Sequence, residues 1–432
     1  MKHSDNKITV VSLGPGGEEW LTPAAARALR EAGCVFVAER CASLVKWAGV
    51  DMETIGSLEE TFSRIEARLE RGIVVAVAVS GDAGVFSLLP RLGKRFPDLP
   101  IAVIPGVSSL QALCAALGET WADAEIVSVH GRQVPPPRVA GLVAHNGKTI
   151  FFCGPDRHPA WICRILADRG IDAEIAVGER LTYPDGRVTK GRPVQLADGV
   201  FDPLSLVLAR NPAPLPLLAN RPEDWEFLRA KVPMTRQEVR TMALDLLGLS
   251  PDSVLWDIGA GTGSVSVAGA RLCPFGEVHA LERSAEALDL LRANKEKFRA
   301  YNLFIHEGSA AALEDLPVPT HVFVGGSGGE LRRMLAHVQG RGADIRVVVS
   351  AVTLGTLCAA FEVLGGFRGR DVLQVSVSRG KVLMGTGVGL GVGTENVVMT
   401  GQNPVTLLSA WTTGNDGENP AGPSPAPLSF NV

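Results

Sequence analysis

The 432-residue sequence predicts an α/β protein made of two different domains. Short apolar runs rich in valine and isoleucine alternate with helix-forming segments, which is the pattern of parallel sheets covered by helices. Glycine-rich loops follow several of these runs, where such folds bind their ligands. A proline-rich stretch at residues 211–222, NPAPLPLLANRP, separates the two halves and predicts a linker.

The first half begins with a regular alternation of strands and helices. Apolar, β-branched runs predict strands at residues 8–13, 34–38, 73–79 and 101–104. Loops that contain glycine follow three of these runs, at residues 14–17, 80–84 and 105–109. Thr22, an N-cap residue followed by Pro23, predicts the start of a helix. This alternation indicates a parallel sheet whose ligand lies at the carboxyl ends of the strands.

A second lobe of the first half has a different sequence pattern. Short strands are expected at residues 126–129, 149–152, 174–177 and 204–208, between helices and proline-rich loops. The run Val134–Pro137 holds three consecutive prolines and is expected to be irregular. We therefore expect a first domain at residues 5–210, with lobes at about 5–118 and 119–210 and a linker at 211–230.

The second half carries the most informative motif, LWDIGAGTG at residues 255–263. The apolar start of the motif predicts a buried strand, and its glycines form a turn that a ligand can approach because no Cβ blocks it. A second strand, residues 277–281, ends in Glu282. A glycine turn with an acid at the end of the next strand is the geometry that holds the ribose of an adenosine.

The spacing of these glycines distinguishes between two classes of nucleoside cofactor, dinucleotides and S-adenosylmethionine. A dinucleotide motif, GxGxxG, needs a glycine where Ser264 or Ser266 stands. The pattern DxGxGxG resembles instead the first motif of Rossmann-like, class I methyltransferases that use S-adenosylmethionine (SAM). Late strands are expected at residues 346–349 and 373–378, so this domain is expected to span 231–405. Residues 412–432, rich in proline, glycine and asparagine, are expected to form a disordered tail.

Composition limits the classes of partner. A hydrophobic content of 46% with 20% charged residues is typical of a soluble globular protein. The net charge of −4, with no long basic run, argues against nucleic acid or an anionic membrane as partner. Seven scattered cysteines form no CxxC pair, which favours a reducing compartment and predicts no metal site. With no signal peptide and no apolar run of ~20 residues, the protein is expected to be cytoplasmic.

Motifs in both halves resemble one pair of families. The first half resembles the tetrapyrrole (corrin/porphyrin) methylases through GPGG at 14–17, Gly81-Asp82, IPGVSSLQALCAALG at 104–118, FFCGPDRHP at 151–159 and ERLTYPDGRV at 179–188. The second half resembles the Rossmann-like methyltransferase that accompanies it in cobalamin synthesis, through KVPMTRQEVR at 231–240, WDIGAGTGSVSV at 256–267, ALER at 280–283 and VFVGGSGG at 322–329. The first family commonly has proline after its Gly-Asp pair, whereas Ala83 stands here.

A fusion of these domains in this order resembles the decarboxylating precorrin C5,15-methyltransferases. The resemblance implies a two-lobed tetrapyrrole methylase fold followed by a class I SAM methyltransferase domain. It implies methylation of a precorrin at C5 by the first domain and at C15 by the second. The second domain is also expected to decarboxylate the acetate side chain on C12. SAM is the expected cofactor, and a homo-oligomer is expected because both parent families often oligomerise.

The resemblance also implies which residues bind SAM. In the second domain, contacts are expected from Thr235, Asp257, Gly259, Gly261, Thr262, Gly263, Glu282, Gly308 and Ser309. Glu282 is expected to hold the ribose and Asp257 to suit the positive charge of SAM. In the first domain, contacts are expected from Pro15, Gly81, Asp82, Val85, Ser108, Ser109, Phe152 and Leu181. Two alternatives stay open: Asp82 caps the next turn, and Thr235 forms a helix capping box with Glu238.

The substrate carries many carboxylates, so local cations matter despite the negative net charge. The candidates for carboxylate binding are Arg132, Lys231, Arg236 and Arg240, because arginine can grip a carboxylate with two hydrogen bonds. The loop Gly325, Gly326 and Ser327 is expected to face the methyl acceptor, unless it is only a flexible turn. We expect no catalytic triad, because an enamine-like carbon needs alignment with the methyl group more than a strong base.

Two other functions fit part of the sequence. The class I fold also serves RNA methyltransferases, but these need a basic face or an RNA-binding module that the sequence does not show. Alternatively, the first half binds SAM without catalysis and leaves a single working site. The intact pair Gly81-Asp82 and the segment 107–109 argue against such decay.

Overall fold

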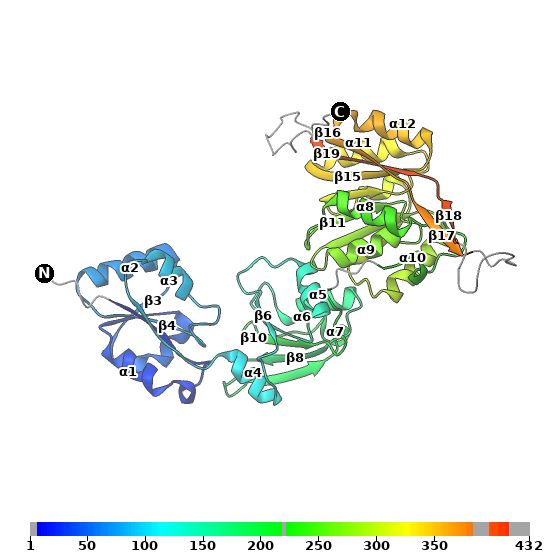
Figure 1. Ribbon diagram of the computed structural model, residues 1–432. Helices are drawn as coiled ribbons and strands as arrows, with labels where there is room; N and C mark the ends of the chain where they lie inside the picture. The colour runs from blue at the N-terminus through cyan, green and yellow to red at the C-terminus, as the bar shows by residue number, and fades with distance from the viewer. Residues whose placement is uncertain (1–6, 218–221, 383–396, 414–432) are drawn as a thin grey trace, which may run out of the picture. The chain divides into compact units, whose positions relative to one another are not determined.

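The computed structural model describes residues 7–217, 222–382 and 397–413 (Figure 1). These residues form two compact units. The first contains the chain through Val134 together with Leu142–Pro214, and the second contains Pro135–Gly141 together with the chain from Leu215 onward. None of the described helices is both long and apolar enough to cross a membrane.

The first unit opens with a five-stranded parallel sheet. Its strands are β1 (Ile8–Ser12), β2 (Cys34–Val37), β3 (Asp51–Thr54), β4 (Val75–Val79) and β5 (Ile101–Ile104), in the order β3-β2-β4-β1-β5. The helices are α1 (Pro23–Glu31), α2 (Leu58–Glu70), α3 (Leu89–Arg95) and α4 (Ser109–Leu117). The side chain of Thr22 accepts a hydrogen bond from the Ala25 amide, which confirms the predicted helix start. β3 was not predicted, because its sequence DMET lacks the apolar run of a buried strand.

The second lobe of this unit contains a mixed sheet. Its strands are β6 (Glu125–Ser128), β7 (Lys148–Phe152), β8 (Glu174–Glu179), β9 (Arg187–Gly191) and β10 (Ser205–Arg210), in the order β6-β7-β10-β8-β9. The helices in this part of the chain are α5 (Pro136–His145), whose residues up to Gly141 belong to the second unit, α6 (Pro159–Asp168) and α7 (Pro193–Leu196). The expectation of an irregular Val134–Pro137 run is wrong for Pro136 and Pro137, which begin α5. The first turn of a helix tolerates proline because its amides have no partner within the helix.

The second unit is built on a seven-stranded sheet. Its strands are β11 (Val254–Ile258), β12 (Glu277–Glu282), β13 (Leu303–Glu307), β14 (His321–Val324), β15 (Ala343–Ala351), β16 (Arg368–Val375) and β19 (Val405–Thr413). Their order is β13-β12-β11-β14-β15-β19-β16, with β19 antiparallel to both of its neighbours. The helices are α8 (Gln237–Leu247), α9 (Ser264–Leu272), α10 (Ala285–Lys297), α11 (Leu331–Arg341) and α12 (Leu354–Val363). A separate hairpin pairs β17 (Ser378–Val382) with β18 (Val397–Gly401).

Strand β19 corrects the expected end of the second domain. The sequence predicted a boundary at 405 and a tail from 412, whereas β19 runs to Thr413 between β15 and β16. Leu407, Leu408 and Ala410 on this strand are buried, so it belongs to the core of the sheet. Residues 414–432 of the expected tail lie outside the described residues.

Candidate cofactor and substrate sites

Three loops at the carboxyl edge of the first sheet hold one another in place. The Gly81 amide donates to the Gly14 carbonyl at 2.7 Å, and the Gly14 amide donates back at 3.2 Å. Gly14 has a φ of +78°, and an added Cβ would lie 2.9 Å from the Trp20 carbonyl oxygen, so the loop requires glycine there. The Ala83 amide donates to the hydroxyl of Ser12 on β1 at 2.9 Å. The loops after β1 and β4 are thus fixed to the sheet.

Asp82 ties the third loop to the second. One of its carboxylate oxygens, Oδ1, accepts the Gly84 amide at 2.8 Å, and the other, Oδ2, accepts the Gly106 amide at 2.8 Å. The structure therefore bears out the alternative that Asp82 caps the turn that follows it. A contact between Asp82 and SAM stays a prediction.

The three loops open onto a cavity of about 710 Å³ that is lined by both lobes of the first unit. All eight residues predicted to bind SAM in this half line it: Pro15, Gly81, Asp82, Val85, Ser108, Ser109, Phe152 and Leu181. The sequence did not single out several other residues of the wall, which include Arg40, Phe86, His130, Arg180 and Tyr183. Tyr183 and Arg180 stand inside the motif ERLTYPDGRV, so motif membership could have indicated them.

Ser108 shapes the part of this cavity formed by α4. Its hydroxyl accepts the Leu110 amide at 3.3 Å, and its own amide donates to the side chain of Gln111 at 2.8 Å. This capping box fixes the first turn of α4, and Ser108 is 3% exposed. Arg132 is absent from the wall, but its guanidinium lies 4.9 Å from the ring centroid of Phe86, which lines it.

In the second unit, the glycines after β11 are required by the backbone. Gly259, Gly261 and Gly263 have φ values of +74°, +56° and +79°. An added Cβ at Gly259 would lie 2.2 Å from the carbonyl oxygen of Gly326, and one at Gly263 would lie 2.2 Å from Leu291. The motif therefore allows both the sharp turn and the close approach of the loop after β14.

Glu282, at the end of β12, braces this glycine loop. One oxygen accepts the Gly261 amide at 2.8 Å, and the other accepts the amides of Arg283 and Ser284 at 2.8 and 2.9 Å. Glu282 also lines a cavity of about 210 Å³. Among the predicted residues, this cavity brings together Gly259, Glu282, Gly308, Ser309, Gly326 and Ser327. Glu282 thus braces the loop and lines the cavity, and its contact with the ribose of SAM stays a prediction.

Asp257 lies beneath the loop rather than in the wall of that cavity. It is 1% exposed, and its Oδ2 atom accepts the hydroxyl of Ser266. Its Oδ1 atom has no hydrogen-bond partner within the described ranges. Burial raises the pKa of this carboxyl to about 7. Gly261, Thr262, Gly263 and Thr235 are also absent from the wall, as is Gly325.

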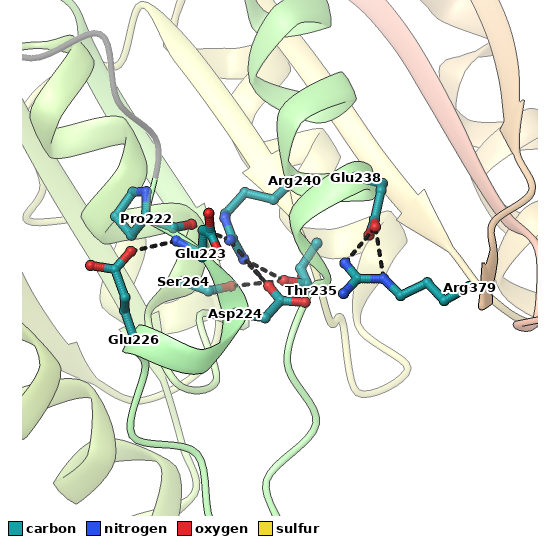
Figure 2. A network of polar contacts seen from close by, with 9 residues as sticks. All are labelled: Pro222, Glu223, Asp224, Glu226, Thr235, Glu238, Arg240, Ser264 and Arg379. Carbon is teal, nitrogen blue, oxygen red and sulfur yellow. Dashed lines mark hydrogen bonds and ion pairs between the residues drawn. The ribbon is translucent and has the colours of Figure 1, made fainter. Parts of the chain in front are cut away.

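Arg240 is the centre of a buried network shown in Figure 2. Its side chain is fully buried and donates to the carbonyls of Thr235 and Pro222, both at 2.7 Å. It forms an ion pair with Asp224 at 3.1 Å and stacks on the ring of Phe227. The expectation that Arg240 binds a substrate carboxylate is therefore wrong, because the protein itself surrounds its guanidinium.

The same network fixes the backbone position of Thr235. Its carbonyl accepts both Arg240 and the Ser264 hydroxyl at the start of α9, at 2.7 and 3.3 Å. The N-cap of α8 is Arg236, without a side-chain cap, and Glu238 pairs with Arg379 instead (Figure 2). The capping box between Thr235 and Glu238 is therefore wrong. Thr235 is held beside the first turn of α9, and its contact with SAM stays a prediction.

The remaining predicted cations are accessible. Lys231 and Arg236 are exposed, and Arg236 donates to the side chain of Gln402. Sequence reasoning did not assign a role to Arg283, which lines the smaller cavity. Its guanidinium lies against Gly328, where an added Cβ would stand 2.4 Å from Nη2. The motif ALER contains this residue, so its position next to Glu282 in the sequence could have indicated it.

Comparison with known proteins gives the family of each half. Residues 7–197 match the Tetrapyrrole (Corrin/Porphyrin) Methylases, and residues 226–391 match the Precorrin methyltransferase domain. A precorrin-6Y C(5,15)-methyltransferase [decarboxylating] from Sinorhizobium sp is 28% identical over 94% of this chain and 95% of its own length. A probable cobalt-precorrin-6B C(15)-methyltransferase (decarboxylating) from Pyrobaculum calidifontis is 39% identical over 44% of this chain and 94% of its own length.

A solved structure matches one half of the chain. The precorrin-6y C5,15-methyltransferase structure from Geobacter metallireducens is 37% identical and covers 46% of this chain and 99% of its own, with a TM-score of 0.40. The full-length match and the separate match of the second half agree with the two family assignments. The chain therefore belongs to the decarboxylating precorrin-6Y C(5,15)-methyltransferases, in which a tetrapyrrole methylase domain precedes a precorrin methyltransferase domain.

Proposed function

We propose that this protein transfers two methyl groups from SAM to a precorrin, one at C5 in the first unit and one at C15 in the second. The second unit also removes the carboxyl group of the C12 acetate as carbon dioxide. The observation that carries the proposal is that each unit has its own cavity at the carboxyl ends of parallel strands, lined by residues of the matching family motif. A separate cavity in each unit favours two working sites over a single one.

The residues present fit SAM in both cavities. In the second unit, glycines at positive φ leave room for a ligand over the loop, and the Glu282 carboxylate can accept hydrogen bonds from ribose hydroxyls. In the first unit, the wall combines the loops of Gly81 and Ser108 with Phe152 of the second lobe. SAM supplies an electrophilic methyl group. The contribution of the protein is to hold that group in line with a ring carbon and to exclude water.

We also propose that exposed cations bind the carboxylates of the substrate. We propose that Arg132 acts at the first site, and that Lys231 and Arg236 act at the second. All three are exposed, so their charged ends can reach a ligand. We also propose that the enzyme works in the cytoplasm as a homo-oligomer without nucleic acid. The seven free cysteines and the net charge of −4 support the compartment and the lack of a polyanionic partner.

The decisive experiment gives the protein labelled SAM and precorrin-6Y and determines the mass of the product. Two methyl groups gained and one carbon dioxide lost support the full proposal. One methyl group gained supports the single-site alternative. Calorimetry with SAM adds an independent count, because two working sites bind two molecules per chain. A product without methyl groups, from protein that binds SAM, contradicts the proposed substrate.

A further inference from the structure

Phe86 has a backbone conformation that does not suit its side chain. It follows the Gly81-Asp82 loop and has a φ of +48°, in the left-handed region that favours glycine. A bulky residue there strains the backbone, and such strain persists where the surrounding structure or a function demands it. Phe86 is 40% exposed and lines the larger cavity, so burial in a core does not explain the choice of phenylalanine.

The contacts of the Phe86 ring suggest what it does. The guanidinium of Arg132 lies over the ring, 4.9 Å from its centroid. The ring of Phe152, which also lines the cavity, meets it edge-on with centroids 5.2 Å apart. Within the described parts of the chain, the side chain of Arg132 has this ring contact but neither an ion pair nor a hydrogen bond. The face of Phe86 is thus the contact that positions this guanidinium.

Two further non-glycine residues with positive φ lie at or beside this cavity. Arg180 also lines it and has a φ of +45°, and Thr182 beside it has a φ of +74°. Arg180 is anchored by an ion pair with Asp185 at 2.7 Å, which fixes its position independently of a ligand. Arg132 has no such carboxylate, so its charge is free to meet an anion. Strained residues often gather at binding sites.

We propose that Phe86 is a positioning residue that holds Arg132 at the mouth of the first cavity to bind a carboxylate of the tetrapyrrole. This inference rests on the proposed function, because the substrate must be a polycarboxylate that enters this cavity. The flat guanidinium stacks on the aromatic face and keeps its edge donors free for a bidentate contact. Left-handed φ at residue 86 is retained because it directs the ring toward Arg132.

Two replacements of Phe86 separate this role from a structural one. Phe86→Gly and Phe86→Ala both remove the ring, but only alanine keeps the strain at positive φ. The Gly variant is therefore expected to unfold at a higher temperature than the Ala variant. Both are expected to raise KM for precorrin-6Y in C5 methylation by the same factor, about three- to tenfold. If KM instead follows stability, with Ala much worse than Gly, Phe86 is structural and the proposal fails.

A double-mutant cycle tests whether Phe86 acts through Arg132. Arg132→Met is expected to raise KM by at least as much as Phe86→Ala, with little change in kcat. The double variant is expected to resemble Arg132→Met, because removal of the arginine leaves Phe86 nothing to position. Additive effects would show that the two residues act separately and would overturn the proposal. Phe86→Tyr retains an aromatic face and is expected to keep KM near the value of the unaltered protein.

Two control measurements on the full-length protein, carbon dioxide release and SAM binding, show whether the effect is confined to substrate binding at the first site. Carbon dioxide release belongs to the second unit, so its initial rate is expected to be unchanged in every Phe86 and Arg132 variant. The two SAM dissociation constants are also expected to be unchanged. Weaker SAM binding in Phe86→Ala would make Phe86 a cofactor contact and overturn the inference. If the unaltered protein neither methylates nor decarboxylates precorrin-6Y, the proposed function fails, which is a different result from a variant that alters KM.

Discussion

At the residue scale, carboxylates brace the loops that shape both cavities. Asp82 joins the amides of two loops in the first unit, and Glu282 joins Gly261 to the start of α10 in the second. Each carboxylate accepts backbone amides with good geometry, which are interactions that stabilise a charged oxygen strongly. Substitution of either residue therefore changes the shape of the loop as well as any contact with the ligand.

Replacement of Glu282 by alanine is expected to weaken SAM binding to the second unit by about 1.5–3 kcal/mol, the scale for hydrogen bonds to a charged group. It also removes the acceptor of the Gly261 amide, so the second unit is expected to lose stability. Calorimetry checks the first effect and a thermal scan the second. Glu282→Gln, which keeps one acceptor oxygen, is the matched control and is expected to lose less. Equal weakening of both SAM sites would contradict a local role.

Asp257 is expected to make the stability of the second unit depend on pH. Its folded pKa of about 7 lies above the unfolded value of 3.8, so the folded state binds the proton more tightly. Its contribution is complete below pH 3.8 and is lost as pH rises toward 7, by up to about 4 kcal/mol. Denaturant unfolding of the unaltered protein and of Asp257→Asn measures this difference. The variant cannot ionise, so its stability relative to the unaltered protein is expected to rise over this window, and an unchanged difference would contradict the prediction.

Arg240 is expected to be essential for the stability of the second unit. Arg240→Met leaves Asp224 without its partner and the Pro222 carbonyl without this donor, and it removes one of the two donors to the Thr235 carbonyl, so a loss of about 3–5 kcal/mol is expected. Lys231→Met, at an exposed position, is the control and is expected to change stability by less than about 0.5 kcal/mol. In differential scanning calorimetry, the unfolding transition of the second unit is expected to move to a lower temperature, while that of the first unit is expected to stay unchanged. A stable Arg240→Met variant with weak substrate binding would reinstate the substrate role.

The positions of glycines and acids were predictable, whereas the partners of individual side chains were not. The motif after β11 predicted a glycine turn, and Gly259 and Gly261 stand there at positive φ, which glycine adopts readily. Burial of Arg240 was not predictable, because it depends on Pro222 and Asp224, residues 18 and 16 positions earlier that fold back onto it. The same holds for Asp82, whose partner Gly106 lies 24 positions away.

At the element scale, the apolar strands were largely predictable, whereas the polar strands β3 and β9 and the last strand, β19, were not. The runs that became β1, β4 and β11 are mostly apolar, as is typical of strands covered on both faces. β9, with the sequence RVTKG, is polar and partly exposed, so no hydrophobic pattern indicated it. β19 is apolar, but it stands next to a tail of low hydrophobicity that obscured its place in the sheet.

Strand β19 gives a prediction for truncated proteins. A chain that ends at Pro404 lacks the strand that pairs with both β15 and β16, so the second unit is expected to lose its cooperative unfolding transition and its SAM binding. A chain that ends at Thr413 retains all seven strands of the described sheet and is expected to keep both. Calorimetry on the two proteins checks this. SAM binding by the first unit serves as the control and is expected to survive in each.

At the scale of the whole molecule, two unrelated folds carry two sites. The first unit combines a parallel sheet with a mixed sheet, and the second is built on a seven-stranded sheet with a separate two-stranded pair, β17 and β18. Each cavity is lined by residues of its own unit, so each site contains its own loops and its own bracing carboxylate. Damage to one set of loops therefore leaves the other set intact.

The products of two single variants test this independence. Gly261→Val places a branched side chain at a φ of +56°, 3.3 Å from the Pro233 carbonyl, so it is expected to abolish C15 methylation and the coupled release of carbon dioxide. The product is expected to carry one new methyl group and all its carboxylates. Asp82→Ala loosens the loops of Gly84 and Gly106 and is expected to give the complement, a decarboxylated product with one new methyl group at C15. Mass spectrometry distinguishes the two products, and calorimetry confirms that each variant still binds one SAM. Continued decarboxylation by Gly261→Val, with SAM absent from the second unit, would place that chemistry in the first unit and reverse the assignment of the two sites.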